Sequence, residues 1–190
     1  MTPGTKSPQK SQTKTVELAL PDESATLAAA RRLAAHLQAG DVVFLIGDLG
    51  AGKTTFARGV IGALPRVCDT GAGDKGCGAG SGGSAEDEVP SPTFTLVQIY
   101  ERRPAPIWHV DLYRLTRPEE AEELGLDEAL GEAITLIEWP DRLGRRVPAN
   151  RLEIRLSYGA TADARSLELA GFGSWAGRLS AVLETAPRGR

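Results

Sequence analysis

The octapeptide Gly47-Asp48-Leu49-Gly50-Ala51-Gly52-Lys53-Thr54 follows an apolar run at residues 42–46 and precedes a predicted helix that extends to about Leu64. It matches the pattern G-x-x-x-x-G-K-[ST], which binds nucleotide phosphates when a strand precedes it and a helix follows it. The glycines let backbone N–H groups turn toward a β-phosphate, and the start of the helix adds its partial positive charge. Lys53 would reach the β- and γ-phosphate oxygens, and the Thr54 hydroxyl would hold Mg²⁺.

The distribution of lysine along the chain supports a specific role for Lys53. The chain has five lysines and otherwise uses arginine as its cation. Three of the lysines lie within the first 15 residues, and Lys75 lies in a glycine-rich stretch. Lys53 is therefore the only lysine in the part of the chain that we expect to fold, and surface decoration would not explain this.

Two carboxylates are candidates for the acid that such a loop needs near its metal ion. Glu138 follows the apolar run at residues 134–137, and Asp111 ends the run at residues 107–110. Ligands bind at the carboxyl ends of the strands in open α/β sheets, so both side chains should emerge near the loop. The alternative, a surface or capping carboxylate, is the less favoured interpretation for each.

A glycine-rich stretch at about residues 67–89 interrupts the predicted domain. Seven of the 22 glycines lie between Gly71 and Gly83, and the stretch has almost nothing to bury, so we interpret it as a flexible insert. Ser91-Pro92-Thr93 closes it and opens a predicted strand. Thr93 could sense a γ-phosphate as a switch residue does, but a turn residue followed by a strand former is an equally good interpretation.

Apolar strands alternate with helices along the rest of the chain, which favours an α/β fold. The predicted helices cover residues 23–38, with Asp22 as N-cap and Gly40 as C-cap, then 52–64, a segment starting at 118 that Gly125 ends or bends, and 174–184. The predicted strands cover residues 42–46, 94–100, 107–112, 134–137, 152–157 and 166–169, and the second and third should form an antiparallel hairpin. We expect a P-loop NTPase-like, three-layer α/β fold with a mixed sheet that includes this hairpin.

Length and composition limit the remaining possibilities. The 190 residues fit one domain at about residues 16–190, preceded by a disordered basic tail at 1–15. The formal net charge of −3 gives no sign of a large nucleic-acid footprint, so no DNA partner is expected. No apolar run could span a membrane, and the first 15 residues lack the apolar region of a signal peptide. A cytoplasmic protein is the expectation.

The sequence lacks the element with which Ras-like GTPases recognise guanine, and this indicates the base of the nucleotide. A Ras-like GTPase would need an Asn/Thr-Lys-x-Asp element, but the only lysine after the loop, Lys75, is followed by Gly and Cys. Adenine is therefore the expected base, and ATP the expected nucleotide. A small-metabolite kinase stays open at this point.

Several blocks of the sequence, taken together and in this order, resemble the bacterial TsaE family, over about residues 16–170. They are Gly47–Thr55, the block Ser-Pro-Thr-Phe-Thr-Leu-Val at 91–97, the block His-Val-Asp-Leu-Tyr-Arg-Leu at 109–115, Glu-Ala-Glu-Glu-Leu-Gly at 120–125 and Ile-Glu-Trp-Pro at 137–140. The resemblance implies an ATPase of tRNA threonylcarbamoyladenosine biosynthesis. It implies a TsaB–TsaD protein pair as partner, with tRNA engaged only through that complex. The insert at 67–89 departs from the family, which usually has a short link there.

The resemblance also implies roles for individual residues. It gives Thr93 as the switch threonine, Asp111 as the acid on the metal side and Glu138 as a group that approaches Mg²⁺. The expected catalytic residues are thus Lys53, Thr93, Asp111 and Glu138, and the expected metal ligands are Thr54, Asp111 and Glu138. The expected nucleotide-binding residues are Leu49, Gly50, Ala51, Gly52, Lys53, Thr54, Thr55, Asp22, Glu23 and Arg165.

Three hypotheses follow from these observations. The leading one is a Mg²⁺-dependent ATPase whose turnover is coupled to a protein partner. The second is a small-metabolite kinase, which would transfer phosphate to a soluble acceptor without a partner. The third is a nucleotide-gated binding module, in which ATP orders Thr93 and the insert while hydrolysis is incidental.

Overall fold

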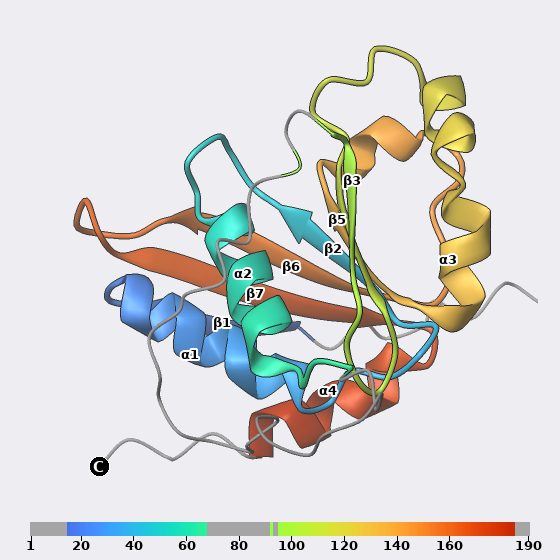
Figure 1. The fold of residues 1–190 in the computed structure, drawn as a ribbon. Helices are drawn as coiled ribbons and strands as arrows, with labels where there is room; N and C mark the ends of the chain where they lie inside the picture. The colour runs from blue at the N-terminus through green and yellow to red at the C-terminus, as the bar shows by residue number, and fades with distance from the viewer. Residues whose placement is uncertain (1–14, 68–91, 93–94, 185–190) are drawn as a thin grey trace, which may run out of the picture.

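A computed structural model describes residues 15–67, 92 and 95–184. These residues form one seven-stranded mixed sheet with the strand order β1-β7-β6-β2-β5-β4-β3 (Figure 1). The strands are β1 (Thr15–Leu20), β2 (Val42–Ile46), β3 (Val97–Tyr100), β4 (Ile107–Asp111), β5 (Ile134–Glu138), β6 (Arg151–Tyr158) and β7 (Arg165–Phe172). The helices are α1 (Glu23–Ala34), α2 (Lys53–Ala63), α3 (Leu126–Glu132) and α4 (Trp175–Glu184), with 3₁₀ turns η1 (Pro118–Leu124) and η2 (Pro140–Leu143).

The centre of the sheet is parallel and its margins are antiparallel. Strand β2 pairs in parallel with both β5 and β6, and β5 pairs in parallel with β4. Strands β3, β7 and β1 complete the sheet through antiparallel pairs, which confirms the predicted β3–β4 hairpin. The carboxyl ends of β2, β4 and β5 therefore meet at one edge, and the glycine-rich loop begins there.

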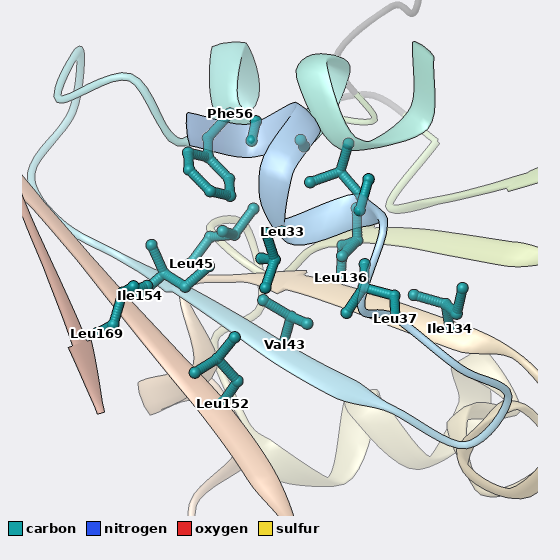
Figure 2. Close-up of a cluster of buried hydrophobic side chains, with 14 of the residues drawn as sticks. Leu33, Leu37, Val43, Leu45, Phe56, Ile134, Leu136, Leu152, Ile154 and Leu169 are labelled. Carbon is teal, nitrogen blue, oxygen red and sulfur yellow. The ribbon is translucent and has the colours of Figure 1, made fainter. Parts of the chain in front are cut away.

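Helices cover both faces of the sheet, which gives three layers. Helices α1 and α2 lie on one face, where Leu33 of α1 and Phe56 of α2 pack against Val43, Leu136 and Ile154 of three strands (Figure 2). Segments η1, α3 and η2 cover the other face over a second, smaller cluster. Strands β2 and β5 are buried on both faces, and accordingly β2 is entirely apolar, while β5 is apolar except for Thr135 and its terminal Glu138. These rigid strands fix the position of the residues at their ends.

The structure corrects two predicted helical segments and adds a strand. Helix α1 ends at Ala34 instead of residue 38, and Gly40, with a φ of 81°, lies in the turn before β2 rather than at a helix end. The segment after residue 118 is a 3₁₀ turn that Gly125 ends in a left-handed conformation before α3 begins. Strand β1 was not predicted. It is an edge strand that pairs only with β7, so its partner is far away in the sequence.

Some predictions fall outside the described residues. They are Thr93, residues 1–14 of the basic tail predicted at 1–15 and residues 68–89 of the insert predicted at about 67–89. Thr15, the last residue of the predicted tail, is the first residue of β1. In the ranges that the structure does describe, none of the helices is long and apolar enough to cross a membrane.

Candidate functional site

The loop between β2 and α2 depends on three glycines with positive φ angles, Gly47 (150°), Gly50 (76°) and Gly52 (102°). At Gly47 a Cβ atom would collide with the backbone carbonyl oxygen of Leu156 on β6. At Gly52, the N-cap residue of α2, a Cβ atom would meet nothing within 4 Å. The first turn of an α-helix has backbone N–H groups without intrahelical partners, and at Gly52 the chain offers open space beside them. This arrangement suits an anion.

Lys53 is the first residue of α2, and its ammonium group lies against the loop that precedes it. The Nζ atom donates hydrogen bonds to the carbonyl oxygens of Gly47 and Asp48, both at 2.8 Å, and lies 4.0 Å from the ring centroid of Trp139. The residue is only 5% exposed. Burial lowers the pKa of Lys53 below its ordinary value, and the nearby carboxylates of Glu138 and Asp111 oppose this shift. The loop thus holds a partly desolvated cation.

Glu138 ends β5, and its buried carboxylate contacts two other polar side chains. The Thr54 hydroxyl donates to Oε1 of Glu138 at 2.9 Å and lies 3.2 Å from Oε2. Nε2 of His109 lies 2.9 Å from the same Oε1 atom. Glu138 is 2% exposed and His109 is fully buried. A carboxylate in this position needs such donors, because leaving it without them would cost several kcal/mol.

Asp111 ends β4 directly beside Glu138. The two residues are paired across the parallel β4–β5 ladder, so their side chains point to the same face of the sheet. Asp111 is buried, and its Oδ1 atom accepts a hydrogen bond from the backbone N–H of Tyr113 at 3.0 Å. We call Lys53, Thr54, His109, Asp111 and Glu138 the carboxylate cluster. Four of these five residues were predicted, and the structure brings those four together.

A cleft of about 440 Å³ borders the glycine loop. We call it the loop cleft. It is lined by Asp22, Glu23, Ser24, Thr26, Gly50, Gly52, Thr55, Asp163 and Arg165. Small-molecule sites have volumes of about 300–1,000 Å³, so the cleft has the size of a ligand site. Three predicted residues distant from the loop in sequence, Asp22, Glu23 and Arg165, line it together, whereas no member of the carboxylate cluster does.

Two side chains from the β6–β7 hairpin hold the glycine loop from outside. The Tyr158 hydroxyl donates to the carbonyl oxygen of Leu49 at 2.7 Å, and Nη2 of Arg165 donates to that of Gly50 at 3.4 Å. The Leu49 side chain is 72% exposed and the Ala51 side chain is buried in the core. Neither residue lines the loop cleft, so any contribution of these two to binding would come from the backbone.

The donor set can be tested against a metal ion. Within residues 15–67, 92 and 95–184, no three His, Cys, Asp or Glu side chains form a group that could hold a metal by itself. Mg²⁺ is usually bound by one or two carboxylates together with substrate phosphates and water. The hard oxygens of Thr54 and Glu138, in mutual contact beside Lys53, fit a Mg²⁺ ion shared with a phosphate group.

Sequence reasoning missed several residues of the site. Two of them are His109, two residues before the predicted acid Asp111, and Trp139, directly after the predicted acid Glu138, and that proximity was the available signal. Tyr158 and the cleft residues Ser24, Thr26 and Asp163 were not predicted at all. Nothing local in the sequence distinguishes these four residues, because their role depends on how β7 and α1 are placed beside the loop.

Comparisons with known proteins agree with this arrangement. The family model described as "Threonylcarbamoyl adenosine biosynthesis protein TsaE" matches residues 20–72 and 74–167. Among proteins named tRNA threonylcarbamoyladenosine biosynthesis protein TsaE, the one from Rickettsia bellii is 39% identical over 137 residues, covering 72% of this chain and 83% of its own. That from Bacillus subtilis is 37% identical, covering 68% and 69%. That from Streptomyces coelicolor is 35% identical, covering 77% and 90%.

A solved structure shows the same architecture. The crystal structure of YdiB from Bacillus subtilis superposes with a TM-score of 0.66 and 28% sequence identity, covering 91% of this chain and 94% of the other. Fold and site thus define a mixed α/β protein in which a glycine-rich loop meets a buried carboxylate at the carboxyl edge of the sheet. The chain belongs to the TsaE family, whose members are named for threonylcarbamoyladenosine biosynthesis in tRNA.

Proposed function

We propose that this protein is a Mg²⁺-dependent P-loop ATPase that binds and hydrolyses ATP in support of a TsaB–TsaD-type complex. That complex would form N6-threonylcarbamoyladenosine next to the tRNA anticodon. The observation that carries the proposal is the contact of the Thr54 hydroxyl with the Glu138 carboxylate, directly beside the partly desolvated Lys53. These three groups come from the start of α2 and the end of β5, and they match what a nucleotide phosphate and its metal ion need.

In this proposal, the loop binds the phosphates and α2 orients them. Lys53 would exchange its two carbonyl contacts for the β- and γ-phosphate oxygens. Lys53 and the backbone N–H groups from Gly50 to Lys53 would stabilise the charge that develops on the transferring phosphoryl group. The loop cleft would receive the adenosine part of ATP, next to Asp22, Glu23 and Arg165.

The carboxylate cluster would organise hydrolysis. Thr54 and Glu138 would hold Mg²⁺, directly or through water, and the ion would neutralise phosphate charge. Asp111 or Glu138 would orient the attacking water, since both carboxylates end adjacent strands on the same face. Thr93 would act as the residue that senses the γ-phosphate.

The partners follow from the family to which the chain belongs. A TsaB–TsaD-type pair would carry out transfer to tRNA, and this chain would contact tRNA only through that pair. The net charge of −3 supports this division of labour, because direct tRNA binding would favour a basic surface. A cytoplasmic location, without membrane or DNA contacts, goes with this role.

The test is ATP hydrolysis by the purified full chain, alone and with the TsaB–TsaD-type pair from the same organism. We expect slow hydrolysis alone, strong stimulation by the pair, and loss of activity on chelation of Mg²⁺. The Lys53→Ala variant is the control and should be inactive in both conditions.

Two results would contradict the proposal. Fast hydrolysis that the pair does not stimulate would show that the ATPase activity is not coupled to the complex. No hydrolysis, even with the pair present, would show that the chain is not an ATPase. Phosphate appearing on a soluble acceptor would support the kinase hypothesis instead. Nucleotide-dependent docking with negligible hydrolysis would support the binding-module hypothesis.

A further inference from the structure

The carboxylate cluster contains a residue that the proposed mechanism does not use. His109 lies on β4 with no exposed surface, and within the described part of the chain its Nδ1 atom has no hydrogen-bond partner. Among the described residues, its polar contact is that of Nε2 with Oε1 of Glu138, at 2.9 Å. Burying an imidazole costs free energy unless its polar atoms are paired. An apolar residue would fill this core position without that cost, so packing alone does not account for a histidine here.

The pairing register of the sheet explains why His109 reaches Glu138. In the parallel β4–β5 ladder His109 is aligned with Leu136, and Asp111 is aligned with Glu138. His109 and Glu138 are therefore diagonal neighbours two residues apart, on the same face of the sheet. Long side chains interact over this diagonal separation. A carboxylate accepts hydrogen bonds and does not donate them, so Nε2 carries the proton in this contact.

Both donors act on the same carboxylate oxygen, but they differ in one respect. Oε1 of Glu138 accepts from the Thr54 hydroxyl and from His109 Nε2, each at 2.9 Å. Under the proposed function the Thr54 oxygen also binds Mg²⁺, so its geometry changes when nucleotide arrives and leaves. His109 is fully buried within strand β4, so the sheet holds its backbone in place. It is the donor whose position is independent of the nucleotide.

We propose that His109 is a positioning residue that fixes the Glu138 carboxylate in its hydrolysis-competent orientation throughout the nucleotide cycle. The inference rests on the proposed function, which places Glu138 in the hydrolytic machinery. Residues that orient metal-binding or catalytic carboxylates from behind typically contribute about 10- to 100-fold to activity when removed. His109 acts through Glu138 and does not touch the substrate.

The test compares two substitutions of His109 in the full chain. His109→Gln keeps an amide N–H near the place of Nε2, whereas His109→Leu fills the space without a donor. We expect His109→Leu to lower kcat for ATP hydrolysis by about 10-fold or more and to change the Kd for ATP by less than about 3-fold. His109→Gln should recover most of the lost kcat. His36→Gln, a substitution of the only other histidine, is the matched control and should hydrolyse ATP like the wild type.

Two further measurements separate positioning from packing. In single-turnover assays, adding His109→Leu to a Glu138→Gln variant should change the rate by less than about 2-fold, because the carboxylate through which His109 acts is already absent. The imidazole ¹⁵N spectrum of the unaltered chain should show His109 protonated at Nε2, with resonances that shift in Glu138→Gln. Since the chain has two histidines, the His36→Gln spectrum assigns the signals.

Three outcomes would overturn the inference. They are wild-type kcat in His109→Leu, equal losses in the Gln and Leu variants together with weaker ATP binding, or additive effects of the His109 and Glu138 substitutions. If His109→Leu fails to fold, His109→Gln and the ¹⁵N spectrum still decide the question. A wild-type chain that hydrolyses no ATP would instead refute the proposed function, while the spectrum would still test the His109–Glu138 contact.

Discussion

The carboxylate cluster and the loop cleft flank the same glycine loop, but they are built differently. In the cluster, Glu138 and His109 are almost fully buried, and the polar side chains bond to one another across elements that are distant in sequence. In the cleft, the polar side chains of Asp22, Glu23 and Arg165 line an open volume of about 440 Å³. The polar groups of the first region contact one another, whereas those of the second region line an open space.

This difference separates two tasks. Buried polar groups are costly to assemble, and preorganised groups are what stabilise charge in a transition state. An open cleft is screened by solvent, so each of its contacts contributes less. We therefore expect substitutions in the carboxylate cluster to act on hydrolysis and phosphate binding with large effects, and substitutions in the loop cleft to act on affinity with small ones.

The largest expected effect is the loss of ATP binding in Lys53→Met. The substitution removes the only cation of the cluster, and the Kd for ATP measured by calorimetry should rise about 100-fold or more. The same change should lower the free energy of unfolding by no more than about 1 kcal/mol. Burial lowers the pKa of Lys53 in the folded wild type, so folding disfavours the charged ammonium. This cost to stability is fully present below the lowered pKa and is lost as pH rises toward 10.5, the ordinary pKa of a lysine. Arg58→Met, an exposed change on α2, is the control, and wild-type affinity in Lys53→Met would refute the loop assignment.

The second effect concerns catalysis without binding. In Glu138→Gln the amide oxygen can still accept from Thr54, but the negative charge is lost. We expect kcat to fall about 100-fold, which corresponds to about 2.7 kcal/mol in the barrier, while the Kd for ATP stays within about 5-fold. Glu101→Gln, on an exposed side chain, is the matched control. Unchanged turnover in Glu138→Gln would show that Glu138 takes no part in hydrolysis. The carboxylate cluster and the loop cleft would then not differ in function as we expect.

The sequence predicted the carboxylate cluster better than the loop cleft, and the reason is physical. The loop motif is local, because its glycines, Lys53 and Thr54 are consecutive. Glu138 could be predicted because parallel strands end at a common edge, although it lies 84 residues from Thr54. The His109 contact could not be predicted, because it depends on the β4–β5 register, which no single strand specifies.

The loop cleft and the edge of the sheet depend on tertiary placement to a greater degree. Strand β1 is stabilised by pairing with β7, about 150 residues later, so its own sequence carries little signal. Asp163 and Tyr158 reach the loop only because the β6–β7 hairpin ends beside it. Helix α1 was predicted four residues too long because apolar residues continue beyond Ala34. The backbone N–H groups of His36 and Leu37, however, bond to carbonyl oxygens three residues earlier, so the α-helical pattern has ended.

A smaller effect is expected from Arg165→Met at the rim of the loop cleft. A cation that lines the nucleotide in a solvent-screened position contributes about 1 kcal/mol. The Kd for ATP should therefore rise about 5-fold, and kcat should stay within about 2-fold. Arg155→Met, an equal charge change on an exposed side chain of the neighbouring strand β6, should alter neither value. A fall in kcat comparable to that of Glu138→Gln would show that the two regions are not functionally separate.

The smallest effect distinguishes the two roles of Asp22, which caps α1 and also lines the loop cleft. Its Oδ1 atom accepts from the backbone N–H of Ala25 at 2.8 Å, and in our proposal the second oxygen would accept from a ligand donor such as an adenine amino group. Asp22→Asn keeps the capping acceptor and replaces the second oxygen by a donor. We expect unchanged thermal stability and a Kd for ATP about 3-fold higher. Asp22→Ala should show the same loss of affinity and also lose about 1 kcal/mol of stability, because the cap is gone. Tighter ATP binding in Asp22→Asn would contradict this role. It would mean that the Asp22 carboxylate repels the negatively charged nucleotide and accepts no hydrogen bond from it.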